Sequence, residues 1–124
     1  MDAKSLAEAF DSFEETWEPR ILAELNGQHV KVARLDGEFV WHAHEDADEL
    51  FYVVDGDLSI EYRDGDREDA VHLGPGDLAV APAGVEHRPV AHEETKVLLF
   101  EPAGTTNTGD AADSDRTITE LDRL

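Results

Sequence analysis

Short runs in which apolar and polar residues alternate are the feature that most constrains what this chain can fold into. Between two Asp-Gly dipeptides at 55–56 and 64–65, for example, Leu58, Ile60 and Tyr62 alternate with polar residues. A period of two is typical of a strand with one buried face, and Asp-Gly between such runs indicates a hairpin turn. No helical pattern interrupts the series after residue 26, so a parallel sheet with crossover helices is excluded. The pattern predicts an all-β sandwich or barrel of about eight strands.

The predicted strands set the domain organisation. In the first, Val30, Val32 and Leu35 mark one face, and Asp36-Gly37 ends it. A single domain is expected, with a helical extension at 1–25, a barrel at 26–101 and a tail at 102–124 that wraps the barrel, ends in a short helix or covers its mouth. The predicted strands cover 30–35, 39–44, 49–54, 58–63, 70–73, 78–81, 88–91 and 96–100.

Three histidines and one glutamate are the candidate site residues. His42 and His44 are two residues apart in an alternating segment, so their imidazoles point to the same face of a strand. Glu49 opens the next strand and faces the two imidazoles if that strand folds back beside the first. His87 follows in a second segment, with Pro89 and Ala91 on its face of the strand.

The two segments resemble the two motifs of the cupin family. In the first, His-x-His, four residues, Glu49, six residues and Gly56 match; in the second, Gly76, Pro82, Gly84 and His87 match in order. The resemblance covers roughly residues 27–101. It implies a cupin double-stranded β-helix, a jelly-roll barrel that closes the exposed edges of its sheets.

The sequence departs from the cupin motifs at two positions. Four residues separate Gly37 from His42, where the family pattern usually has five. Ala91 stands where an asparagine usually closes the second motif, so one polar group is lost from the strand that carries His87. Neither departure replaces a presumed metal ligand.

The candidate ligand set, His42, His44, Glu49 and His87, suits one divalent transition metal. Neutral imidazoles with one carboxylate bind Fe, Mn, Co, Ni, Cu or Zn, and ligand type alone does not choose among them. Four protein ligands leave one or two positions open for water, O2 or a bidentate substrate. A barrel that keeps the motif without a metal is the alternative.

An amphipathic helix is predicted over residues 4–17. Ser5 and Glu8 form a capping box, and Leu6, Phe10, Phe13 and Trp17 follow helical spacing. We expect this apolar stripe to pack on the barrel or on a second subunit, and a homodimer is predicted because two-fold pairing is the commonest closed assembly. A lid over the substrate is the alternative role.

The charge of the chain limits its partners. Thirty Asp and Glu against ten Lys and Arg give a net charge of −20, dispersed along the sequence, which is typical of a surface adapted to high salt and predicts a halophilic source. Nucleic acid and anionic membranes are polyanions and are not expected partners. Cysteine is absent, and neither a signal pattern nor a membrane-length apolar run occurs, so a cytoplasmic protein is expected.

The remaining polar side chains give no catalytic assignment. His29, His72 and His92 fall outside the motifs and are interpreted as surface or strand-edge residues. Lys31, Trp41 and Tyr62 carry chemistry, and the hydroxyl of Tyr62 reaches either the cavity or its rim. No acid or base inside the barrel is identified besides the four metal ligands.

Two classes of function follow. The first is a metal-dependent enzyme acting on a small, partly apolar molecule, either an oxygenase or an isomerase. Because no positioned base is identified, an isomerase that works by proton transfer is less favoured than an oxygenase. The second is a non-catalytic module that binds a metal or a small ligand such as a sugar. The barrel alone does not separate them, because one fold hosts many functions.

Overall fold

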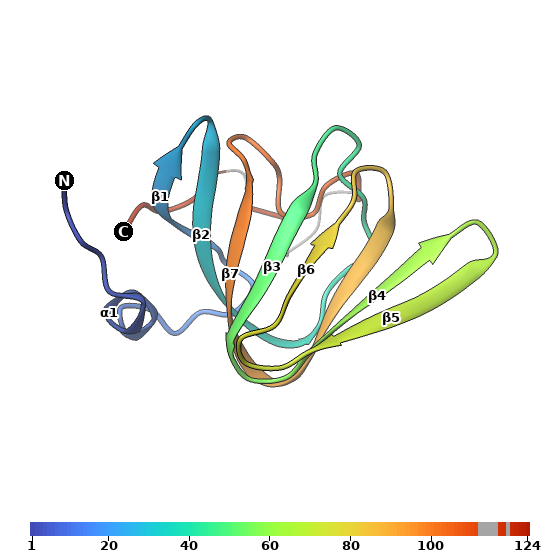
Figure 1. The fold of residues 1–124 in the computed structure, drawn as a ribbon, viewed down its shortest axis with the longest axis horizontal. Coiled ribbons are helices and arrows are strands. Elements are labelled where there is room, and N and C mark those ends of the chain that lie inside the picture. Colours follow the sequence, from blue (N-terminus) through green and yellow to red (C-terminus); the bar gives the residue numbers. More distant parts are fainter. Residues whose placement is uncertain (112–116, 119) are drawn as a thin grey trace.

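The computed structural model of the protein describes residues 1–111, 117–118 and 120–124, and its described part is one short helix and seven strands (Figure 1). Every strand pairing is antiparallel, which confirms the all-β prediction. The elements are α1 (Leu6–Asp11), β1 (Arg20–Leu25), β2 (Gln28–Glu38), β3 (Glu49–Asp55), β4 (Leu58–Asp64), β5 (Arg67–Leu73), β6 (Leu78–Ala81) and β7 (Glu86–Pro102).

Strand β7 joins the two halves of the barrel. The larger sheet has the order β1-β2-β7-β3-β6, while β4 pairs with β5 and with β7. The first part of β7 lies beside β4, with Ala91 opposite Leu58, and its second part lies between β2 and β3, with Leu99 opposite Lys31 and Phe51. One strand therefore crosses from one sheet to the other, as the predicted jelly-roll barrel requires (Figure 1).

The strand boundaries differ from the prediction at two places. The predicted strands 88–91 and 96–100 are one continuous strand, because Thr95 in the polar stretch between them is buried and accepts a hydrogen bond from the Asp57 amide. The predicted strand 39–44 is irregular: beyond β2 its ladder consists of an isolated bridge between His42 and His87, with Phe39 N–H donating to Pro89 O.

The N-terminal region also departs from the prediction. Ser5 caps α1 by accepting a hydrogen bond from Glu8 N–H, but the helix ends at Asp11 instead of continuing to residue 17. Trp17 adopts a left-handed φ of 63°, stacks on Phe39 at 4.8 Å and donates its indole N–H to Asp36 O. Burial of this ring in the barrel outweighs the helical spacing. Strand β1 then occupies residues that were assigned to the helical extension.

Two apolar clusters make the core. The barrel interior holds Leu35, Phe51 and Ile60 among others, and a smaller cluster packs Phe10 against Val32 under α1. Val32 and Leu35 therefore face opposite sides of β2, contrary to the shared face that was predicted, because an odd residue spacing changes face in a strand.

The apolar stripe of the N-terminal region is covered by its own chain. Phe10 and Phe13 are buried in the cluster that also contains Leu22 of β1 and Val32 of β2. This helical stripe therefore does not require a second subunit for its burial. No helix in the described ranges has the length and apolar character needed to cross a membrane.

The described part of the tail wraps the barrel. Ile21 N–H donates to Asp122 O and Leu124 N–H donates to Ile21 O, so the chain end runs beside β1. Asp110 N–H donates to Ala43 O, which fixes the start of the tail over the segment that carries His42 and His44. The described tail residues contain turns and no helix, and the predicted terminal helix partly falls on residues outside the described ranges.

Candidate metal centre

The four side chains predicted as ligands converge inside the barrel. His42, His44, Glu49 and His87 each present one ligand atom, all four atoms lie within 4.8 Å of one another, and all four residues are buried. Glu49 opens β3 and His87 lies near the start of β7, while the two other histidines come from the irregular segment between β2 and β3. Nε2 of His44 lies 3.7 Å and Nε2 of His87 lies 3.6 Å from Glu49 Oε1.

Backbone carbonyl groups set the tautomer of two of these imidazoles. His42 Nδ1 donates to Val40 O at 2.9 Å, and His87 Nδ1 donates to Val85 O at 3.0 Å. Each Nε2 then carries a lone pair, which is the form that binds a metal. Nε2 of His44 and of His87 is buried and has no hydrogen-bond partner. A divalent transition metal would satisfy these atoms, so the residues fit such an ion.

The environment favours the neutral imidazole of His42 and the ionised carboxylate of Glu49. Burial, together with the neighbouring His87, lowers the pKa of His42 to about 4. Burial alone would raise the pKa of Glu49, but a hydrogen bond from Glu101 and interactions with His44 and His87 hold it well below its usual range. Both shifts favour the protonation states that a cation requires from its ligands.

The structure adds a buried ion pair that the sequence analysis did not find. Lys31 Nζ lies 2.6 Å from Glu101 Oε1, and both side chains are 2 % exposed. Burial raises the pKa of Glu101 to about 9, helped by its hydrogen bond to the ionised Glu49 and opposed by Lys31.

A signal for Glu101 was present in the strand register. Because Leu50 pairs with Phe100 and Phe51 with Leu99, Glu49 lies opposite Glu101 one step further along these antiparallel strands. Glu101 is therefore a titratable group inside the barrel that the sequence analysis did not identify. Strand alternation by itself did not give this result, because the pairing between β3 and β7 is a tertiary contact.

The other histidines divide into two kinds. His29 is buried, with Nε2 3.3 Å from Glu24 Oε2, so its interpretation as a surface residue is wrong. His72 and His92 are exposed on the outer face, as expected, and both contact the Ser59 hydroxyl.

The remaining polar candidates and the substituted motif position have clear environments. The guanidinium of Arg63 lies over the Trp41 ring, 3.9 Å from the ring centroid. Ala91, at the position of the usual motif asparagine, is 3 % exposed and packs in the apolar core opposite Leu58.

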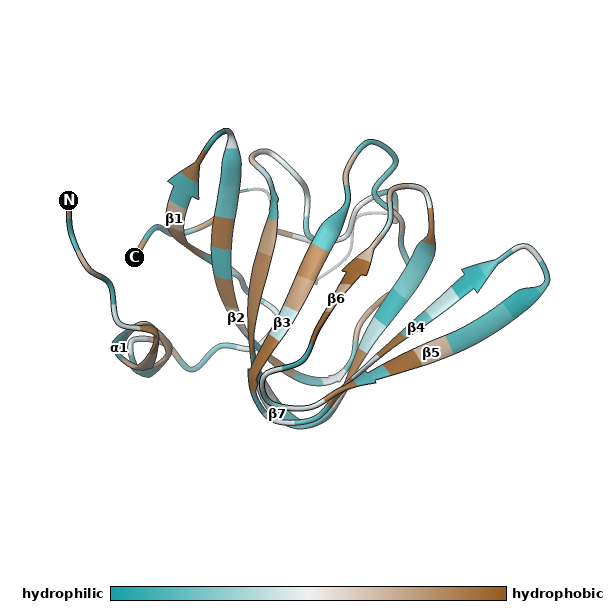
Figure 2. Cartoon of the chain, viewed as in Figure 1, coloured by the Kyte–Doolittle hydropathy of each residue, from teal (hydrophilic) through white to brown (hydrophobic). Residues whose placement is uncertain are grey.

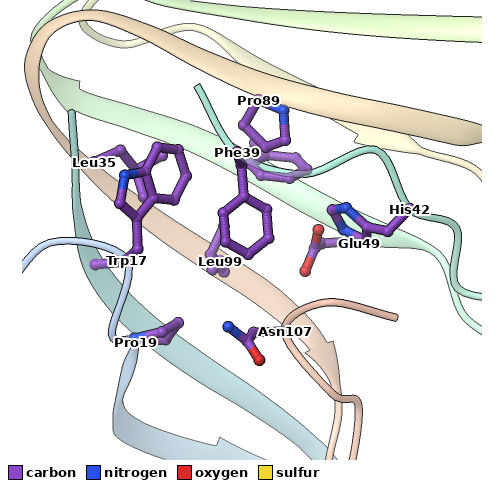
Figure 3. Close-up of a pocket in the computed structure, with 11 residues that line it drawn as sticks. Trp17, Pro19, Leu35, Phe39, His42, Glu49, Pro89, Leu99 and Asn107 are labelled. Carbon is purple, nitrogen blue, oxygen red and sulfur yellow. The ribbon is translucent and has the colours of Figure 1, made fainter. Parts of the chain in front are cut away.

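A small cavity of about 40 Å³ adjoins the ligand set on the side of the N-terminal region (Figure 3). Trp17 and Phe39 give it apolar walls, His42 and Glu49 lie at one end, and Asn107 reaches in from the tail. Asn107 accepts a hydrogen bond from Ile118 N–H, so the tail contributes to this wall. The ligand set is therefore bordered by a cavity that the chain itself closes.

This arrangement of strands and ligands agrees with a family comparison. Residues 28–101 match the Cupin_2 cupin-domain family, and all four ligand residues fall within the match. The chain belongs to the cupin family. A solved cupin-2 domain protein from Shewanella frigidimarina is 41 % identical, covers 80 % of this chain and 93 % of its own, and superposes with a TM-score of 0.75.

Two curated relatives extend the comparison. The uncharacterised protein YdbB of Bacillus subtilis is 39 % identical over 80 residues, which are 64 % of this chain and 68 % of that protein. Acireductone dioxygenase 1 of Coprinopsis cinerea is 42 % identical over 57 residues, which are 44 % of this chain and 32 % of that enzyme. The match thus spans about a third of the dioxygenase. The dioxygenase activity is therefore stated for that enzyme and not for this chain.

Proposed function

We propose that this cupin is a metal-dependent oxygenase of a small organic molecule, with one divalent transition metal held by His42, His44, Glu49 and His87. The observation that carries the proposal is the convergence of four buried ligand atoms within 4.8 Å, two of them imidazole nitrogens without a partner. A metal held by four protein ligands supplies open positions for O2 and for substrate oxygens. The chain fixes the tautomers of His42 and His87 through the carbonyl oxygens of Val40 and Val85.

The surroundings of the ligand set favour an oxygenase over an isomerase. Isomerisation by proton transfer needs a base that reaches the substrate. Glu101 is the additional carboxyl inside the barrel, but Lys31 and Glu49 already occupy it. Oxygenase chemistry requires less from the protein side chains, and a relative that is 42 % identical over 57 residues is named as a dioxygenase.

The experiment is O2 uptake by the iron(II)-loaded protein with a panel of small diketones, phenols, thiols and sugars. Turnover is expected in the native protein and in the control His72→Ala, whose imidazole lies on the outer face, and is expected to be lost in Glu49→Ala and His87→Ala. If no substrate turns over with iron, manganese, nickel or zinc, yet a ligand shifts the metal spectrum, the protein is a non-catalytic binding module. Turnover that survives both ligand variants would place the chemistry elsewhere.

We also propose a homodimer, formed through the outer face of the larger sheet. Leu50 pairs with Phe100 and with Val80, and Tyr52 pairs with Leu98 and with Leu78, so these side chains form two adjacent apolar rows. Leu78 and Val80 are 58 % and 49 % exposed. In Figure 2 the ribbon of β3 and β6 carries brown, hydrophobic stretches. A contiguous apolar face on so acidic a chain is typical of an interface.

Light scattering in molar salt tests the dimer. The native protein is expected at twice the monomer mass, and Tyr52→Glu combined with Leu98→Glu is expected at the monomer mass. A native monomer at micromolar concentration would contradict the homodimer.

The remaining proposals concern organisation and setting. We propose one cupin domain, with residues 1–25 as an N-terminal extension, 26–101 as the barrel and 102–124 as a tail. Two contacts support it: Phe10 packs against Val32 of β2, and the end of the tail hydrogen-bonds to Ile21 of β1. The net charge of −20 supports a cytoplasm of high salt concentration, in a halophilic organism, as the setting of the protein.

A further inference from the structure

A second and larger cavity, of about 290 Å³, adjoins the ligand set on the opposite side from Trp17. It lies between the edge strands β5 and β6: β5 pairs only with β4, and β6 pairs only with β3. The two strands diverge at this side of the barrel in Figure 1. Its lining residues include Tyr62, Asp64, Val71, Val80, Ala81 and His87.

The position of Val71 shows that this cavity opens to solvent. Val71 pairs with Ile60, which is 4 % exposed in the barrel core, so both side chains lie on the interior face of their strands. Nevertheless Val71 is 37 % exposed. An interior-facing residue with this exposure marks an unclosed side of the barrel.

The inner end of the cavity reaches the ligand set. His87 lines the cavity and pairs with Tyr62 across the β4–β7 ladder. On the facing strand, Ala81 lines the cavity and pairs with Glu49. The methyl side chains of Ala79 and Ala81 leave room between β6 and the ligand residues. A molecule in the cavity therefore lies against the metal ligands.

The lining also restricts the charge of the occupant. No Lys or Arg is among the lining residues, and the one charged carboxylate, Asp64, lies at the exposed end. An anionic ligand would meet this carboxylate and find no compensating cation, which opposes its burial. The apolar walls and the Tyr62 phenol suit a neutral molecule with one polar end.

From these contacts we propose that the opening between β5 and β6 is the binding site for the substrate, and that the substrate is a neutral, largely apolar molecule of single-ring size with one polar end. The proposal rests on the metal-dependent function proposed above. The polar end faces the position of the metal, and the ring lies beside Val71. Tyr62 is a specificity-determining residue whose hydroxyl contacts the polar end of the ligand.

The test uses calorimetric titration of the zinc-loaded protein with catechol and with 3,4-dihydroxybenzoate, which adds one carboxylate to the same ring. Catechol is expected to bind at least about tenfold more tightly, because the added charge has no partner in the cavity. Val71→Trp, which fills the opening from the interior face of β5, is expected to abolish catechol binding with unchanged zinc content. Leu25→Trp, on β1 and 47 % exposed, is the matched control and should bind as the native protein does.

Separate readouts distinguish the two proposals. A protein that binds no zinc contradicts the metal centre, whereas a protein that holds zinc but binds catechol equally well with a filled opening contradicts this substrate site. Tighter binding of 3,4-dihydroxybenzoate than of catechol overturns the inferred neutral class. Tyr62→Phe is expected to weaken catechol about tenfold, as for one lost hydrogen bond, and an unchanged affinity removes Tyr62 from the site.

Discussion

Lys31 Nζ and Glu101 Oε1 lie 2.6 Å apart inside the barrel, and the Glu101 carboxyl also hydrogen-bonds to Glu49 in the ligand set. The pair connects β2 to β7, and its second carboxyl oxygen faces β3. A desolvated ion pair is a weak source of net stability, because the loss of hydration offsets much of the attraction. Its contact with Glu49 indicates that it orients this ligand.

Removing one member of this pair is expected to be strongly destabilising. Lys31→Met leaves Glu101 beside Glu49 without its cation, and the free energy of unfolding should fall by about 3–5 kcal/mol in urea titration. Adding Glu101→Leu to Lys31→Met removes the unpaired group and should restore much of the loss. A double variant that is less stable than Lys31→Met would contradict an energetic coupling of this kind.

Metal content should depend on the four converging residues and not on the outer histidines. Native protein purified without chelator is expected to contain about one transition metal per chain by elemental analysis. His44→Ala should lose most of it, because His44 Nε2 is one of the buried nitrogens that lack a partner. His92→Ala, on the exposed face, is the control and should keep it. Full metal content in His44→Ala would exclude this ligand assignment.

The metal-free protein should show a His42-dependent loss of stability in acid. Burial, the largest cause, lowers the pKa of His42 from 6.5 to about 4, so between these values the unfolded state binds more protons. The contribution of neutral His42 to the free energy of unfolding is complete above pH 6.5. It is lost as the pH falls towards 4, and the total loss is about 3 kcal/mol.

Glu101 contributes with the opposite sign, because its pKa is raised to about 9 and its effect on stability declines as the pH rises. The informative quantity is therefore the difference between native protein and His42→Gln across pH 4–7, from urea titrations. Parallel pH profiles for the two proteins would rule out the His42 contribution.

Trp17 should contribute to stability as a core residue. The ring is 8 % exposed and stacks on Phe39 at the wall of the small cavity. Trp17→Ala is expected to cost about 3–5 kcal/mol in unfolding free energy. Leu25→Ala, at a position on β1 that is 47 % exposed, is the control and should change the unfolding free energy by less than about 0.5 kcal/mol. Equal stabilities would mean that Trp17 does not form part of the barrel core.

Stability should increase with salt, because a net charge of −20 on a small domain generates self-repulsion. The melting temperature is expected to rise steeply from low to molar salt and to remain sensitive beyond the range of simple screening. A flat melting temperature across this series would show that the acidic surface is not an adaptation to salt.

The sequence by itself determined the class of fold and the ligand set. Alternation of apolar residues specifies which side chains of a strand share a face, and this correctly placed Glu49, Phe51 and Val53 inside the barrel. The spacing of His42, His44 and His87 relative to the turns identified the residues that the structure brings within 4.8 Å of one another. Strand alternation and residue spacing are both local properties of the chain, so they can be read directly from the sequence.

Only the tertiary structure decided which residues surround the ligand set. Trp17 left the predicted helix because its burial against Phe39 outweighs local spacing, and Lys31 meets Glu101 through the pairing of β2 with β7. The opening at Val71 exists because the edge strands β5 and β6 do not pair with each other in the described part of the chain. These relationships join positions far apart in the chain, and the free energy of packing and strand pairing that fixes them is a property of the whole fold.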